Sequence, residues 1–96
     1  MIQTDKGHFW LTFENGYTIS VFNGYGSYSE NYLKKELSCT SDSINSKNCE
    51  IAIIYNEIFV TNNFIECTDS VKGYINADEL ADIIYKVKKF KGDNNV

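Results

Sequence analysis

The chain has 96 residues, 43% of them hydrophobic and 15% aromatic, which is enough apolar material for one core and excludes a disordered chain. The formal net charge is −4, and all nine basic residues are lysines. Because arginine is the side chain best suited to bidentate contacts with phosphates and base edges, this composition disfavours direct nucleic-acid binding.

The three cysteines, Cys39, Cys49 and Cys67, predict reduced thiols. Their number is odd and no two are spaced as CxxC, so neither a zinc site nor a full disulfide framework is indicated. The chain does not open with a basic segment followed by an apolar one, and no run approaches the ~20 apolar residues of a membrane span. We therefore expect a soluble cytoplasmic protein.

The first predicted element is a β-hairpin over residues 8–23, with strands at about 8–14 and 17–23. Asn15 and Gly16 separate the two apolar runs. Asn-Gly is the strongest short signal for a two-residue type I′ turn, because both residues tolerate the positive φ that this turn needs.

The register that follows from a two-residue loop makes both faces of this hairpin apolar. In that register Thr12 faces Ile19 and Trp10 faces Val21, and side chains alternate between the faces. A sheet covered on one side only should have one polar face. We therefore expect the second face to be covered by the following loop or by another molecule. One face carries Phe9, Leu11, Phe13 and Phe22, and the other carries Trp10, Tyr17, Ile19 and Val21.

Residues 24–48 form a long segment without a sustained period, in which a brief helix at 30–37 with Ser29 as its cap is the only regular element we expect. Loops of this length are uncommon in compact domains and are often functional or covering elements. Strand character returns in a second hairpin at 50–60, and a short strand is predicted at 70–75.

The clearest helix is predicted at residues 77–90. Asn76 can cap it, Glu79 stands three residues later as in a capping box, and lysines crowd its negative end. We expect one domain over residues 1–96 of the α+β class, an antiparallel sheet of about four to five strands with this C-terminal helix packed on one face. The apolar stripe of the helix consists of Leu80, Ile83, Ile84, Val87 and Phe90.

The sequence predicts no catalytic residues, no metal and no cofactor. The glycine-rich stretch after the first hairpin lacks the spacing and the lysine of a phosphate-binding loop. His8 is the only histidine, and no partner for acid–base chemistry is identifiable in the sequence. The acidic residues of the second half do not have the spacing of a calcium-binding loop.

The tyrosines of the irregular segment are the candidate partner-binding residues, because tyrosine provides rigid contact area with a polar tip. Two interpretations remain open: the loop covers the hairpin with its rings inward, or it presents them as a recognition surface. Acidic neighbours would add attraction to a basic protein. The candidate residues are Tyr25, Tyr28, Glu30, Tyr32, Glu36 and Asp42.

Two stretches resemble a group of small proteins encoded by phages and prophages. The first, TFENGYTISVFNGYGSYSEN, matches the pattern TFxNGYTxSVxxGxGxYxxN, and the second, GYINADELADIIYKV, matches GYxxxDELADIIxKV. The resemblance covers most of residues 9–88, with an insertion at about 34–47 relative to shorter members. It implies a phage or prophage setting. Small acidic phage proteins without enzymatic motifs are frequently inhibitors of host machinery, including anti-CRISPR and other counter-defence proteins.

These features lead to three hypotheses. The first is a non-enzymatic phage or prophage protein that binds a host protein, such as a CRISPR nuclease or another defence effector, and blocks it. The second is a protein that sequesters a small signalling nucleotide in a pocket formed by Gly24, Gly26 and the tyrosines. The third is a self-associating phage structural or assembly factor whose hairpin forms a homodimer interface.

Overall fold

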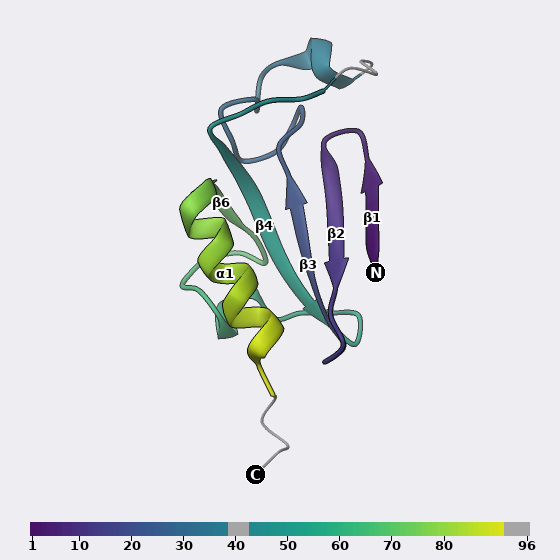
Figure 1. The fold of residues 1–96 in the computed structure, drawn as a ribbon. Coiled ribbons are helices and arrows are strands. Elements are labelled where there is room, and N and C mark those ends of the chain that lie inside the picture. Colours follow the sequence, from purple (N-terminus) through teal and green to yellow (C-terminus); the bar gives the residue numbers. More distant parts are fainter. Residues whose placement is uncertain (39–42, 92–96) are drawn as a thin grey trace.

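The computed structural model describes residues 1–38 and 43–91, which form one antiparallel sheet and one long helix (Figure 1). The sheet has the order β1-β2-β3-β4-β5. The sixth strand, β6, also pairs with β4, on the same edge as β5 and opposite β3. This architecture confirms the predicted α+β class. The strands are β1 (Ile2–Asp5), β2 (His8–Thr12), β3 (Tyr17–Phe22), β4 (Asn48–Tyr55), β5 (Ile58–Phe59) and β6 (Lys72–Asn76), followed by α1 (Ala77–Lys89).

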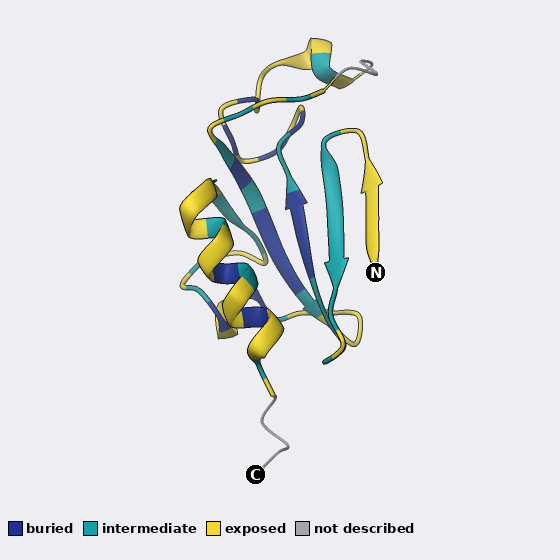
Figure 2. Cartoon of the chain, viewed as in Figure 1, coloured by how far each residue is buried: buried dark blue, intermediate teal, exposed yellow. Residues whose placement is uncertain are grey.

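The core lies between α1 and the central strands of the sheet. Alternate residues of β3 and β4 point to this side, and α1 presents its apolar stripe to them. Figure 2 shows buried residues in β3, in β4 and on α1. The helix packs against β3 and β6, whereas β1 and β2 extend beyond it (Figure 1). Phe9, Leu11 and Phe13 are therefore only half-buried. The fully enclosed core residues include Ile19, Val21, Ile51, Ile53, Ile75, Ile83 and Val87.

The β2–β3 hairpin is located where the sequence predicts it, but the predicted turn and register are wrong by one residue. The N–H of Phe13 donates to Tyr17 O at 2.9 Å, so the loop contains three residues. Gly16 alone among them has a positive φ, of 91°. This is the three-residue hairpin in which glycine takes the left-handed position, not a type I′ turn.

The one-residue shift separates the two hairpin faces differently from the prediction. Val21 lies opposite Phe9, and Ile19 lies opposite Leu11 on the core side of the sheet. Trp10 lies opposite Ser20 on the other side. That second face therefore alternates aromatic with hydroxyl-bearing residues and is less apolar than predicted.

The Asn15 side chain connects the hairpin turn to the end of α1. Its Nδ2 donates to Val87 O at 2.9 Å and to Phe90 O at 2.8 Å, near the helix end where the regular i→i+4 bonding stops. Val87 O also accepts from Phe90 N at 3.2 Å. Its Oδ1 accepts from Tyr17 N at 3.0 Å. One amide thus fixes both the turn and the position of the helix.

Strand β1 was not predicted from the sequence. It pairs with β2 through a two-residue turn at Lys6 and Gly7, whose φ values of 41° and 83° match a type I′ turn. The same turn type joins β4 to β5, where Asn56 and Glu57 have φ values of 54° and 66°. Glutamate at the second turn position is unusual for a type I′ turn.

The prediction of a short helix at 30–37 is wrong, because the structure has only a 3-10 turn, η1 (Lys35–Ser38), in that region.

The long helix α1 begins at Ala77 with both bonds of the predicted capping box. Glu79 N donates to Asn76 Oδ1 at 2.8 Å, and Asn76 N donates to Glu79 Oε1 at 3.0 Å. Within residues 1–38 and 43–91, no helix has the length and apolar character needed to cross a bilayer.

An aromatic stack lies on the sheet face opposite α1. The His8 ring stacks on Trp10 with centroids 3.9 Å apart and on Phe22 at 4.9 Å. His8 Nε2 is 2.6 Å from Ser20 Oγ. His8, for which the sequence identifies no partner, is thus half-buried and lies within hydrogen-bond distance of a hydroxyl.

This environment makes stability depend on pH. Burial lowers the pKa of His8 below 6.5, and the charges of Glu50 and Asp5 offset part of that shift. A proton therefore binds more readily to the unfolded chain, so the His8 contribution is complete above about pH 6.5 and is lost as the pH falls towards the folded pKa. In urea titrations between pH 7 and 5, we expect the unfolding free energy of His8→Gln to fall less than that of the wild type. Equal pH slopes would contradict this assignment.

Candidate functional site

Residues 24–33, here called the tyrosine loop, leave β3 and cross the end of the sheet without regular secondary structure. Their side chains alternate between buried and exposed positions. Ser27, Ser29 and Asn31 are at most 2% exposed. Tyr28, which follows Ser27, and Tyr32, which follows Asn31, are each 43% exposed. The structure therefore places small polar side chains inside and tyrosine rings outside.

Polar contacts fill the interior of the tyrosine loop. Ser27 Oγ donates to Gly24 O at 2.7 Å and also lies 2.7 Å from Ser29 Oγ. The amide of Asn31 donates to Asn23 O at 2.7 Å and to Asn45 O at 3.1 Å. Asn31 Oδ1 is the one buried side-chain polar atom among the described residues that has no hydrogen-bond partner. The paired members of a buried polar network favour one conformation of the segment that carries them. The serines and Asn31 thus hold the loop in shape.

The backbone of the tyrosine loop is equally well paired, because every N–H from residue 26 to residue 32 donates a hydrogen bond. Two of these bonds reach β4: Tyr28 N donates to Glu50 Oε1 at 3.0 Å, and Glu30 N donates to Asn48 Oδ1 at 2.8 Å. Such pairing in an irregular segment restricts local opening. The loop is therefore expected to be as rigid as the strands beside it.

The tyrosine loop also contacts β6. Tyr74 N donates to Tyr28 O at 2.9 Å. A Cβ atom built on Gly73 would lie 2.5 Å from Tyr28 Cβ, so glycine is required for this approach. Tyr74 itself has a φ of 57°, a strained conformation for a bulky residue, and its ring is exposed.

These contacts bring four exposed rings to one end of the molecule, and we call Tyr25, Tyr28, Tyr32 and Tyr74 the tyrosine surface. Tyr28 and Tyr32 stack with centroids 5.8 Å apart and planes inclined by 26°. Sequence reasoning missed Tyr74, because nothing in its local sequence indicates that β6 lies beside residue 28.

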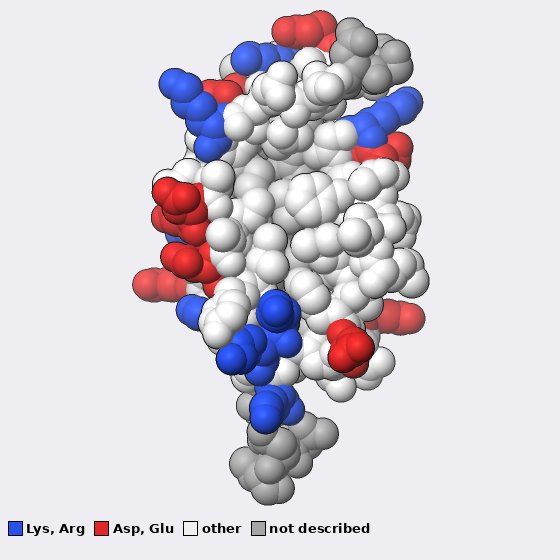
Figure 3. All heavy atoms as spheres, in the orientation of Figure 1, with Lys and Arg blue, Asp and Glu red and all other residues white. Residues whose placement is uncertain are grey.

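The acidic candidates lie in a mixed electrostatic environment. Glu30 Oε2 accepts from Lys47 N at 2.8 Å, so one of its oxygens stabilises the fold. Glu36 lies in η1 directly after Lys34 and Lys35, and Figure 3 shows both signs of charge at this end of the molecule. The remaining candidate, Asp42, lies outside the described residues. The acidic surface expected from the sequence is therefore interrupted by lysines.

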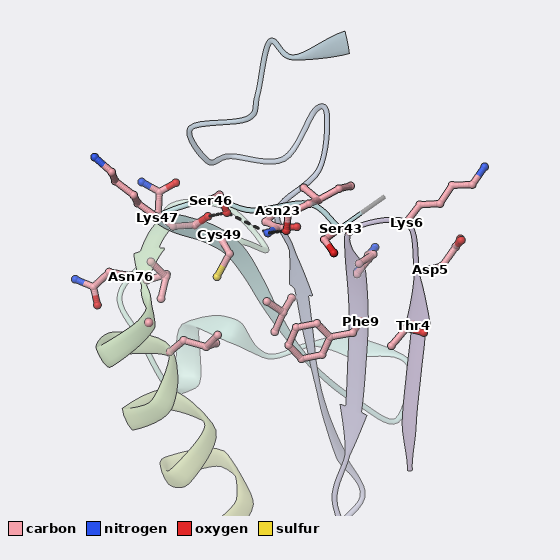
Figure 4. A pocket seen from close by; sticks show the side chains of 18 residues that line it. Thr4, Asp5, Lys6, Phe9, Asn23, Ser43, Ser46, Lys47, Cys49 and Asn76 are labelled. Carbon is pink, nitrogen blue, oxygen red and sulfur yellow. Dashed lines mark hydrogen bonds between the residues drawn. The ribbon is translucent and has the colours of Figure 1, made fainter. Parts of the chain in front are cut away.

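A cleft that the sequence did not indicate opens on the helix side of the sheet, between the N-terminal end of α1 and the β1–β2 turn (Figure 4). Its volume is about 530 Å³. Gly24, Gly26, Tyr25 and Tyr32 do not line it, so it is not the pocket of the nucleotide hypothesis. The apolar part of its lining consists of Phe9, Val21, Ile44, Cys49, Ile75, Ala77 and Leu80.

The His8–Ser20 pair has the separation of a general base and a nucleophile, at 2.6 Å. Ser20, however, lies in the middle of β3 and is paired with Trp10 on one side and Ala52 on the other. Backbone N–H groups of such a central strand are engaged in the sheet and do not form an oxyanion hole. We interpret the pair as a means of satisfying a buried hydroxyl.

Among the described residues, no group of three or more His, Cys, Asp or Glu side chains is arranged to hold a metal ion. Comparisons of the chain with models of protein families, with curated proteins and with solved structures found no match.

Proposed function

We propose that this chain is a non-enzymatic phage or prophage protein that binds and inhibits a host defence protein, either a CRISPR nuclease or another effector. The observation that carries the proposal is the tyrosine surface. Four exposed rings stand on backbone that hydrogen bonds hold in place. Large tyrosine areas are enriched at protein interfaces, and a rigid surface loses little conformational entropy when it binds.

The stack of Tyr28 and Tyr32 is the expected centre of the interface. Interface energy concentrates in a few well-packed aromatic and arginine side chains. Glu30 and Glu36 follow Tyr28 and Tyr32 in the sequence, are exposed, and would meet cationic residues of the partner. On a nuclease, such contacts would compete with nucleic-acid phosphates for the same lysines and arginines. Because lysines interrupt the acidic surface, we expect the rings to contribute more affinity than the charges.

The proposal is tested by plasmid interference in bacteria with an active CRISPR system. Expression of the wild type should restore transformation by a targeted plasmid. The double variant Tyr28→Ala/Tyr32→Ala should lose most of this effect, because truncating central interface aromatics commonly costs about 2 kcal/mol or more each. Tyr85→Ala, which removes an exposed ring from α1, should keep it.

Two outcomes would contradict different parts of the proposal. No restoration by the wild type, across strains with different CRISPR nucleases, would exclude a CRISPR nuclease as the target. Full activity of the double variant, together with unchanged far-ultraviolet circular dichroism, would exclude the tyrosine surface as the binding site.

A further inference from the structure

The cleft exists because α1 covers only part of the core side of the sheet. Val21, Cys49 and Ile75 form its floor and are nearly inaccessible to water. Phe9 from β2 and Leu80 from α1 are half-buried and form facing walls. In Figure 4 the side chains of Phe9 and Cys49 point into the space between the helix and the sheet. The floor of the cleft thus consists of core residues that α1 does not cover.

None of the described residues that form this floor carries a formal charge at pH 7. Burial, together with the charge of Glu50, raises the pKa of the Cys49 thiol to about 11, so it is neutral at pH 7. At the rim, Asn23 Nδ2 donates to Ile44 O at 3.2 Å and to Ser46 Oγ at 3.1 Å. This amide is already engaged by its own chain. The interior therefore favours a hydrocarbon group over a polar one.

The charged residues of the lining lie at the rim. Lys6 is in the β1–β2 turn and Lys47 immediately precedes β4, so the two lysines flank the mouth from opposite sides, and their side chains extend outward (Figure 4). Asp5 is the one carboxylate among the lining residues. The described residues of the rim therefore carry a formal net charge of +1 (two lysines minus one carboxylate), although the whole chain carries −4.

We propose that the cleft binds a straight-chain fatty acid, with its hydrocarbon tail on the apolar floor and its carboxylate at the mouth between Lys6 and Lys47. The volume of about 530 Å³ is within the range of about 300–1,000 Å³ typical of small-molecule sites. The long lysine side chains can fold back over a carboxylate at the rim. This site is separate from the tyrosine surface and does not depend on the function proposed for it.

The test is titration calorimetry with decanoate below its micelle concentration, with octanoate and decyltrimethylammonium as comparison ligands. Decanoate should bind with a 1:1 stoichiometry. Each methylene that enters the cleft should raise the affinity by about fourfold, so octanoate should bind more weakly. Decyltrimethylammonium has the same tail and the opposite charge, and should bind about tenfold more weakly or not at all.

Matched variants locate the site. Ala77→Leu places a larger side chain in the lining, whereas Ala81→Leu makes the same change on an exposed part of α1 outside it. Only the first should weaken decanoate binding, by about tenfold or more, since filling the cleft removes buried methylenes. Circular dichroism and thermal melts verify that both variants fold.

The charge requirement is tested by two double variants with equal loss of charge. Lys6→Gln/Lys47→Gln should weaken decanoate binding, whereas Lys88→Gln/Lys91→Gln, at the far end of α1, should not. The inference is overturned if decanoate does not bind, if the cationic ligand binds equally well, or if both members of either variant pair behave alike. Failure of the wild type to restore transformation by the targeted plasmid, with decanoate binding intact, would exclude a CRISPR nuclease as the target without affecting the assignment of the cleft.

Discussion

Replacing Gly73 by alanine is expected to displace the tyrosine loop from β6 and to abolish partner binding. The new Cβ would lie 2.5 Å from Tyr28 Cβ and 3.0 Å from Tyr28 O, and both distances are too short for the present packing. The hydrogen bond from Tyr74 N to Tyr28 O would stretch or break. We expect the free energy of unfolding to fall by about 2 kcal/mol, the usual cost of forcing extra atoms into a packed site.

The clash itself can be isolated by a double-mutant cycle on stability. In a Tyr28→Gly background the nearest atom is absent, so Gly73→Ala should destabilise the chain less than it does in the wild type. Chemical denaturation of the four proteins gives the coupling energy. Additive effects of the two substitutions would show that Gly73 does not position Tyr28.

The second large effect is expected from Asn15→Asp, which keeps the size of the side chain and removes its N–H donors. Val87 O and Phe90 O would lose their hydrogen bonds from Asn15, and Val87 O would keep only the one from Phe90 N. A carboxylate would also face the negative end of α1. Losing these hydrogen bonds and adding this repulsion should lower the free energy of unfolding by about 2–3 kcal/mol.

The control for this substitution is Asn63→Asp, which makes the same chemical change at an exposed residue of the 3-10 turn η2 (Thr61–Asn63). Its effect on stability should be within about 0.5 kcal/mol of zero, as is usual for exposed positions. Equal losses for the two variants in urea denaturation would exclude Asn15 as the residue that links the hairpin to the helix.

The fold class and the long helix were predictable from the sequence because local signals carry them. Asn76 and Glu79 form a capping box that is visible in the sequence, and the apolar stripe of α1 has helical spacing. The hairpin was also located, by Asn15 and Gly16. Its register was not, since the same residue pair suits both a two-residue and a three-residue loop. The contact from Asn15 to Val87, 72 residues away, accompanies the three-residue form.

Strand β1 escaped prediction for a different reason. Its four residues, Ile2–Asp5, are all exposed and show no hydrophobic alternation, so only their pairing with β2 makes them a strand. The outward direction of the tyrosine rings also could not be predicted from the local sequence. Ser27, Ser29 and Asn31 have the composition of an exposed loop, yet contacts to distant residues bury them and turn Tyr28 and Tyr32 outward.

The central claim is that the tyrosine loop is a rigid platform and not a flexible connection. Amide hydrogen exchange by NMR tests it most directly, because each N–H from residue 26 to residue 32 donates a hydrogen bond. We predict that these seven amides exchange at least about 100-fold more slowly than in an unstructured peptide, comparable with amides of β3. Exchange of this segment at the rates of an unstructured peptide would contradict the account.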